Sequence, residues 1–425
     1  MKKQKNMYPR YGYRVLGKGR RISNDTMLTH LNNNDLICGS SGSSKTGSVV
    51  YTQLKTVTDS SLIVADTKGR LSKLFSKELK SRGYDVLCLD FVNPENSCKY
   101  NPIDYIRRNR DGSVREQDIA KIVASLIPTE NSDELFWPLA ARSVLEFFVA
   151  YMMEALPPVD HNMYTVGKLY RAFASDAACG ERGFMDFIEN NPDSFTAKRY
   201  SMVKSMQNAE RMMSSIYGFV NTALYPFDAS ELKHIYDPGS PSGRRPRRKL
   251  DIAKLGRRKT VLFLNIPDSD HSVDNLVNLF YTQALQTLIS EADGNPDGRL
   301  RIPVRIMMDD FASSTTIPDF DRIISVVRSR DIWLTLSIQS FTQLESIYSH
   351  NQALTIINNC DHIVYLGSND MESASFIGTR ALKTPETVLA MDRSKEYFIE
   401  GGKTAELIDK VPPYSYTEDE AEPEQ

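Results

Sequence analysis

Short runs of consecutive apolar residues, each followed by a turn residue, recur along the chain. Runs at 36–38, 61–65, 85–89, 260–266, 304–308, 332–338 and 362–366 are predicted to be buried parallel strands. Several of them lead through a loop into a helical segment, an alternation typical of a sheet with helices on both faces. Because these runs lie near both ends of the sequence, we expect one α/β domain to be assembled from two separate parts of the chain.

Between about residues 111 and 227 the strand pattern stops. Methionine, alanine, leucine and aromatic residues recur there at helical spacing, as in 137–151. We therefore expect the first part of the α/β domain at 1–110, an inserted all-α subdomain at 111–227, a basic linker at 228–259 and the second part of the α/β domain at 260–416. The acidic stretch 417–425 is expected to be a disordered tail.

The composition is that of a globular protein. Of 425 residues, 41% are hydrophobic and 25% charged, and the net charge of −2 means that any nucleic-acid surface must be a local stripe or a pore lining. The five cysteines are widely spaced and predict reduced thiols, with no zinc-ligand spacing. The basic N-terminus is not followed by an apolar stretch, and no run is long enough for a membrane-spanning helix.

A glycine- and serine-rich loop follows the first predicted strand and precedes a segment that can form a helix. It consists of Gly39, Ser40, Ser41, Gly42, Ser43, Ser44, Lys45, Thr46 and Gly47. In a phosphate-binding loop, backbone N–H groups surround the phosphates, a lysine reaches the terminal ones and a threonine hydroxyl holds Mg²⁺. Ser44 stands where the usual pattern has glycine, so strain in the loop is expected. The alternative is a turn that merely precedes a lysine.

Two carboxylates end the apolar strand 304–308. In an α/β ATPase this position carries the acid that supports Mg²⁺ and the acid that orients water, so Asp309 is the candidate metal acid and Asp310 the candidate general base. A glutamate is usual at the second position, and aspartate is one methylene shorter. A strand that simply ends at a solvated turn is the alternative.

Two weaker candidates flank the next strand. An arginine at a helix end near the carboxyl edge of the sheet, Arg328 or Arg330, can stabilise a transferring phosphoryl group in a neighbouring subunit, and Gln339 at a strand tip can sense that group. Exposed arginines on helices are more often solvated or salt-bridged, so that reading stays open.

Taken together, these motifs resemble the type IV coupling proteins, the conjugative DNA-transfer ATPases of type IV secretion. The resemblance spans roughly residues 17–416. It is carried, beyond the segments above, by Arg21-Ile-Ser-Asn-Asp25, Asp66-Thr-Lys68-Gly69, Tyr100-Asn101-Pro102, Phe136-Trp137, Ile266-Pro267-Asp268, Ile317-Pro-Asp-Phe320 and Asn359-Cys-Asp361.

The resemblance implies a RecA-like P-loop NTPase with an all-helical insertion, ATP and Mg²⁺ as ligands, and hydrolysis between the subunits of a homo-hexameric ring. It implies catalytic roles for Lys45, Asp310, Arg328 and Gln339, and metal binding by Thr46 and Asp309. The implied partners are the single-stranded transfer strand of DNA, the relaxase of the relaxosome and components of the secretion channel. The residues themselves do not separate single- from double-stranded DNA.

Three departures from the family pattern matter. The transmembrane helices that usually begin family members are not seen, so we expect a cytoplasmic protein held at the inner face of the membrane through a partner. Ser44 and Asp310 leave open a nucleotide-binding adaptor that recruits the relaxase complex with little hydrolysis. The segment 244–249, with four arginines and a lysine, could contact DNA phosphates or be a solvated loop. A small-molecule kinase fits the long helical insertion poorly.

Overall fold

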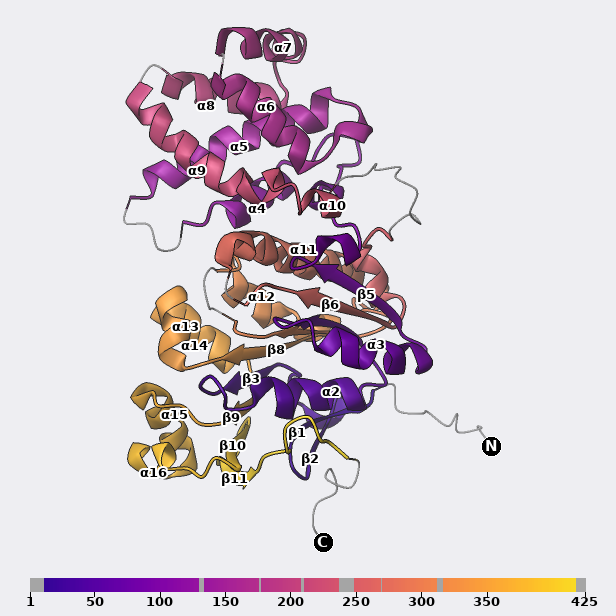
Figure 1. Cartoon of the computed structure of the whole chain (residues 1–425), viewed down its shortest axis with the longest axis vertical. Coiled ribbons are helices and arrows are strands. Elements are labelled where there is room, and N and C mark those ends of the chain that lie inside the picture. The colour runs from indigo at the N-terminus through magenta and orange to yellow at the C-terminus, as the bar shows by residue number, and fades with distance from the viewer. Residues whose placement is uncertain are drawn as a thin grey trace.

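The computed structural model describes residues 11–129, 134–175, 177–207, 210–236, 248–268, 270–311 and 316–417. A large sheet occupies the middle of the molecule, and a group of helices from the middle of the sequence lies at one end (Figure 1). The expected tail at 417–425, beyond its first residue, and the arginines at 244, 245 and 247 lie outside the described residues.

The central sheet has nine strands in the order β11-β10-β9-β3-β8-β7-β4-β6-β5. Its strands are β3 (Asp35–Cys38), β4 (Ser61–Ala65), β5 (Asp85–Asp90), β6 (Thr260–Asn265), β7 (Val304–Met308), β8 (Ile332–Ile338), β9 (His362–Tyr365), β10 (Lys395–Glu400) and β11 (Glu406–Asp409). All pairs from β9 to β5 are parallel, and β10 and β11 extend one edge antiparallel. The mainly parallel sheet expected from the sequence is confirmed.

Helices cover both faces of this sheet. Alternate residues of β4 point to opposite sides, as a strand requires: Leu62 and Val64 pack with one set of helices and Ile63 with the other. The first set is α2 (Tyr51–Thr56) and α3 (Leu71–Ser81), and the second includes α11 (Asp274–Asp293), α12 (Phe320–Val326), α13 (Phe341–Ile347) and α14 (His350–Asn358).

The smaller elements complete this part of the molecule. They are β1 (Tyr13–Gly17), β2 (Arg20–Ser23), α1 (Thr26–Thr29), η1 (Lys45–Val50), η2 (Pro94–Asn96), η3 (Pro102–Tyr105), η5 (Ile252–Gly256), η6 (His271–Val273), η7 (Arg328–Arg330), α15 (Met371–Ala381) and α16 (Pro385–Leu389). The β1–β2 hairpin is antiparallel and separate from the large sheet.

The chain between β5 and β6 is mostly helical. Its main helices are α4 (Glu116–Leu126), α5 (Phe136–Ala155), η4 (Pro158–Asp160), α6 (Met163–Ser175), α7 (Ala177–Asn190), α8 (Phe195–Gln207), α9 (Glu210–Asp228) and α10 (Lys233–Tyr236). In the described part of this segment the only strand-like pairing is isolated bridges. Because β5 and β6 are neighbours in the sheet, the helical segment leaves the sheet and returns to it at one edge.

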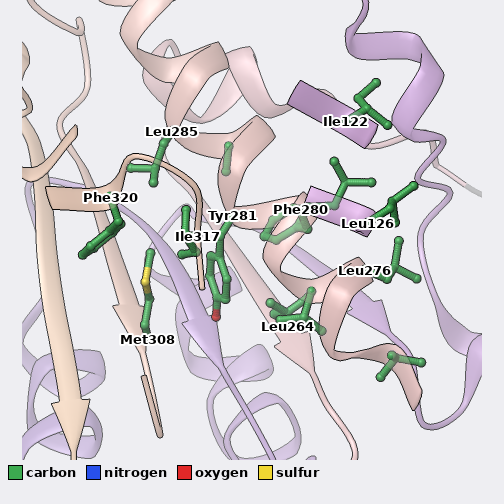
Figure 2. Packing of buried hydrophobic residues seen from close by; sticks show 14 of the residues in the cluster. Ile122, Leu126, Leu264, Leu276, Phe280, Tyr281, Leu285, Met308, Ile317 and Phe320 are labelled. Atoms are coloured by element: carbon green, nitrogen blue, oxygen red, sulfur yellow. The ribbon is translucent and has the colours of Figure 1, made fainter. Parts of the chain in front are cut away.

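One helix, α11, joins the helical segment to the sheet. Figure 2 shows Phe280 of α11 between Leu264 of β6 and Leu126 of α4, while Tyr281 of the same helix lies beside Ile317. These side chains are almost fully buried. The helical segment and the sheet therefore share one continuous apolar core.

Candidate functional site

The loop 39–44 joins the carboxyl end of β3 to η1. Little room is left for a side chain at its first position, because a Cβ on Gly39 would press against Ser43 Oγ and lie 3.0 Å from Leu366 Cβ. Gly42 has φ +80°, which L-residues rarely adopt. The loop therefore turns tightly into the helical segment, as expected for a phosphate-binding loop.

Ser44 lies in the left-handed region with φ 74° and ψ 25°. Glycine adopts this region without steric cost, whereas a Cβ is disfavoured there. The backbone at Ser44 therefore has the strained conformation that the sequence predicts. The loop therefore adopts the conformation that glycine favours, although Ser44 carries a Cβ.

Lys45 is buried beneath the loop. Its Nζ donates to Gly39 O at 2.8 Å and to Ser40 O at 3.5 Å, and lies 4.0 Å from Asp310 Oδ1. The ammonium group is thus held at the centre of the loop by carbonyl groups. A terminal phosphate placed there would meet a cation already in position.

Thr46 and Asp309 lie in direct contact. The Thr46 hydroxyl donates to Asp309 Oδ2 at 2.8 Å, and Ser337 Oγ donates to Asp309 Oδ1 at 2.9 Å. A hydroxyl and a carboxylate are hard oxygen ligands of the kind that Mg²⁺ prefers, with water completing its shell. Among the described residues no group of three or more His, Cys, Asp or Glu side chains could hold a metal by themselves. A cation at Thr46 and Asp309 would therefore share its coordination with water and phosphate.

Asp310 and Gln339 lie beside this pair. Burial, and then the neighbouring charge of Asp309, raise the pKa of Asp310, while Lys45 and a hydrogen bond with Gln339 act in the opposite direction. Asp310 has φ 47°, a backbone conformation that is uncommon for non-glycine residues and is found at functional sites. A carboxylate with a raised pKa is a stronger base than an ordinary aspartate and is therefore better suited to accept a proton from water.

These groups line one pocket of about 300 Å³ at the carboxyl ends of the parallel strands. The pocket is formed by the loop, by residues that follow β4, β6, β7 and β8, and by Tyr414 near the C-terminus. This edge is where open α/β sheets bind ligands. The predicted residues Lys45, Thr46, Asp309, Asp310 and Gln339 are all brought together here.

Further charged residues of the pocket were not singled out as site residues from the sequence. After β4, Asp66 accepts hydrogen bonds from the backbone N–H groups of Arg70 and Ser72 and so caps α3. Lys68 and Arg70 add positive charge, and Asp268 adds a carboxylate after β6. The sequence signal that could have identified these residues is their place directly after a buried strand.

The charges in the pocket favour an anion accompanied by a metal ion. Its cations are Lys45, Lys68 and Arg70, and its carboxylates are Asp66, Asp268, Asp309 and Asp310. Carboxylates this close would repel a bare polyphosphate. A divalent cation at Thr46 and Asp309 would remove that repulsion, so the residues present fit Mg²⁺ bound to a polyphosphate.

The expected position of Arg328 near the carboxyl edge of the sheet is wrong. It lies on η7 directly before β8, at the amino edge, because α12 runs back across the sheet after β7. The exposed side chain donates from Nη2 to His30 O at 3.0 Å. Arg330 lies beside it and pairs with Asp293 at 2.8 Å. Neither arginine lies at the pocket of its own chain.

The described end of the basic segment is engaged in ion pairs. Arg248 contacts Asp85 through both terminal nitrogens, and Lys249 Nζ lies 2.9 Å from Asp104 Oδ2. These two cations therefore link the segment that leads into β6 to β5 and η3. Both remain largely exposed, so the contacts are of the weak surface kind.

Within the described residues, no helix combines the length and apolar character needed to cross a membrane.

A family model described as "Type IV secretory system Conjugative DNA transfer" matches residues 4–384. Similar solved structures include the bacterial conjugative coupling protein TrwBdeltaN70 in its unbound monoclinic form, with a TM-score of 0.65 and 13% identity over 94% of this chain and 88% of that one. Plasmid coupling protein TrwB in complex with ADP and Mg²⁺ gives a TM-score of 0.61 and 12% identity over 91% and 86%.

VirB4 of Thermoanaerobacter pseudethanolicus gives a TM-score of 0.53 and 13% identity over 96% of this chain and 97% of that one. At such identities the likeness shows the fold, and the RecA-like P-loop NTPase class expected from the sequence is confirmed. No curated protein matches the chain.

Proposed function

This chain belongs to the type IV secretory system conjugative DNA transfer family, and from that premise we propose that it is an ATP-hydrolysing coupling protein that moves DNA towards a transfer channel. The observation that carries the proposal is the contact between Thr46 and Asp309, 2.8 Å apart, at the mouth of the loop that holds Lys45. It joins a phosphate-binding loop to a metal-binding acid, the two parts that hydrolysis of a nucleoside triphosphate requires.

The proposed chemistry assigns one task to each group. Backbone N–H groups of residues 39–47 and the Lys45 ammonium bind the phosphates, and Mg²⁺, when bound at Thr46 and Asp309, neutralises charge on them. Asp310 orients the attacking water and accepts its proton. Gln339, hydrogen-bonded to Asp310 at the tip of β8, positions that carboxylate and senses the terminal phosphate.

The proposed partners follow from the family and from a solved TrwB complex that holds ADP and Mg²⁺. They are ATP with Mg²⁺, the transferred DNA strand, the relaxase of the relaxosome and components of the secretion channel. The chain would assemble as a homo-hexamer in the cytoplasm, held at the inner face of the membrane through a partner.

The test is phosphate release from Mg-ATP with and without DNA. We expect DNA to stimulate release, and Lys45→Ala to lower it at least about 100-fold, because a preorganised cation at the transferring group contributes that much. Lys403→Ala removes an exposed lysine elsewhere and serves as the control. Phosphate release that is unchanged in Lys45→Ala would overturn the proposal.

The role of Arg328 in a neighbouring subunit can be tested by mixing subunits. Lys45→Ala and Arg328→Ala chains should each be inactive alone. In mixed rings, an intact Lys45 from one variant can meet an intact Arg328 from the other, so hydrolysis should partly return. No recovery in mixtures shown to co-assemble would exclude a role in trans.

A second function, the weakly hydrolysing adaptor, is favoured by Ser44 and by the short Asp310. If the native site is impaired, Ser44→Gly combined with Asp310→Glu should raise turnover sharply. We expect a change of less than about threefold, because the loop is already in the glycine-like conformation and Asp310 already lies beside Lys45. A rise of about thirtyfold or more would support the adaptor instead.

A further inference from the structure

The segment after β11 returns to the nucleotide loop. Val411 is buried and forms a small apolar cluster with Val15 and Tyr416, against which Tyr51 of α2 packs. Tyr414 N–H then donates to Gly47 O at 3.1 Å. In Figure 1 this segment, in yellow, passes in front of the indigo β1 and beside α2. The C-terminal part of the chain is thus attached to the first turn that follows Lys45 and Thr46.

The Tyr414 ring lies directly against the backbone of Gly47. A Cβ at that position would be 2.9 Å from Tyr414 Cε2 and 3.2 Å from Cζ, so glycine is what permits this approach. The ring is also packed edge-on against Tyr51, with centroids 5.6 Å apart and planes at 80°. Tyr51 is in turn held against Phe75 of α3. The orientation of the Tyr414 ring is therefore fixed by the molecule itself.

Stability alone does not account for this arrangement. Tyr414 is 55% exposed although its ring lines the pocket. It also has φ 59°, which is costly for an aromatic residue. Strained residues that present a fixed side chain to a pocket are typical of ligand-binding positions. One edge of the ring packs against Gly47 and Tyr51, and the rest of the ring is exposed at the pocket.

The ring lines the same pocket as the residues that are expected to hold the phosphates. The phosphates belong at Lys45 and Thr46, and Gly47, which Tyr414 contacts, is the next residue along the chain. The same pocket contains all four residues. A planar aromatic ring with a free surface is a stacking partner for a nucleobase.

We propose that Tyr414 forms the base subsite and stacks on the nucleobase of the bound nucleoside triphosphate. This inference rests on the proposed function, since it takes the loop as the triphosphate site. Stacking depends on the ring and not on the hydroxyl. Since every base has a π-face, the subsite accepts different nucleobases without strong discrimination.

The test compares the affinities of Mg-ATP and Mg-tripolyphosphate for the whole chain. Tyr414→Ala should weaken ATP binding about tenfold while changing tripolyphosphate binding less than about twofold, since base stacking on an aromatic ring commonly contributes this much. Tyr414→Phe, which keeps the ring, should bind both like the native chain. Tyr225→Ala removes a tyrosine of similar exposure in the helical segment and is the matched control.

Equal weakening of ATP and tripolyphosphate by Tyr414→Ala would overturn the inference, because it would mean that the ring only supports the loop. Unchanged ATP binding would overturn it as well. Loss of ATP binding in Tyr414→Phe would assign the contact to the hydroxyl and not to stacking. If neither probe binds the native chain, or if both bind Lys45→Ala normally, the proposed function itself fails, and that outcome is distinct from the first three.

Discussion

Thr46 and Asp309, which are 263 positions apart in the sequence, share a hydrogen bond of 2.8 Å between the threonine hydroxyl and carboxylate Oδ2. They meet because β3 and β7 are parallel strands on either side of β8, so the residues that follow them reach the same edge of the sheet. A third residue, Ser337 of β8, holds the other carboxylate oxygen.

Replacing Asp309 by Asn should raise the Mg²⁺ concentration needed for half-maximal hydrolysis at least about tenfold, since loss of a carboxylate near a metal commonly has this effect. An amide oxygen can still accept from Thr46, so the fold should persist. Titration of hydrolysis with Mg²⁺ measures the effect. Nucleotide binding in the presence of a chelator should change little. If the Mg²⁺ requirement stays unchanged, Asp309 does not support the metal.

The Ser44→Gly substitution should raise the free energy of unfolding by up to about 1 kcal/mol. Relief of a left-handed Cβ is worth about 1–2 kcal/mol, and the greater backbone freedom of glycine in the unfolded chain offsets about 0.5–1 kcal/mol of it. Chemical denaturation measures the difference. Ser43→Gly is the matched control, because Ser43 has no positive φ, and it should be destabilising. A loss of stability in Ser44→Gly would show that the serine is not strained.

Hydrolysis should lose activity at acid pH with an apparent pKa above the ordinary range for aspartate, because Asp310 is the proposed general base. Burial and the charge of Asp309 raise its pKa, and a general base works only when it is deprotonated. Activity should therefore fall as pH drops through this raised pKa, and Asp310→Asn should lower turnover about 100-fold or more. The pH profile of phosphate release tests this, with the exposed Asp193→Asn as control. An acid limb that persists unaltered in Asp310→Glu and Asp310→Asn would assign it to another group.

Glu396 should make stability depend on pH outside the site. Its carboxyl is buried beneath Gly17, and one oxygen has no hydrogen-bond partner among the described residues. Burial raises its pKa well above the usual value, and Lys410 offsets this only in part. The contribution of the protonated carboxyl is complete below the unfolded pKa of about 4.3 and is lost as pH rises through the folded pKa.

Glu396→Gln should therefore be more stable than the native chain at pH 8 by roughly 1–3 kcal/mol, the range for a buried polar group without a partner. The difference should shrink as pH falls and vanish below about pH 4. Denaturation at several pH values measures it, and the exposed Glu231→Gln serves as the control. A difference that does not vary with pH would mean that the pKa of Glu396 is the same in the folded and unfolded chains.

The strands of the parallel sheet could be predicted from the sequence because they are buried on both faces and read as unbroken apolar runs. In contrast, β10 and β11 were not predicted. In β11, three of four residues are exposed or charged, so no apolar run marks it. The hairpin of β1 and β2 was missed because arginines interrupt the few apolar residues of both strands, although β1 is largely buried.

Within the site, the positions of residues that directly follow a strand could be predicted from the sequence. The positions of residues that depend on how distant elements are arranged in the fold could not. Lys45 and Asp309 each follow a strand whose direction is known, so their edge of the sheet is known too. The edge of the sheet at which Arg328 lies depends on where α12 ends and β8 begins. The sequence pattern around Arg328 indicated the end of a helix, but it did not indicate at which edge of the sheet that helix ends. Tyr414 lies in a turn-rich segment close to an acidic tail, and its contact with Gly47 depends on the whole fold.

The order of strands has a consequence for synthesis of the chain. The first three strands of the large sheet, β3, β4 and β5, do not pair with one another. Each of them pairs only with strands that come later in the chain, namely β6, β7, β8 and β9. A growing chain that has not yet passed Thr260 therefore carries three apolar strands with no hydrogen-bonded neighbour, which is the condition under which nascent chains aggregate. Truncated products ending within the helical segment should be insoluble, and the ribosome must release most of the chain before the phosphate loop and its acids can meet.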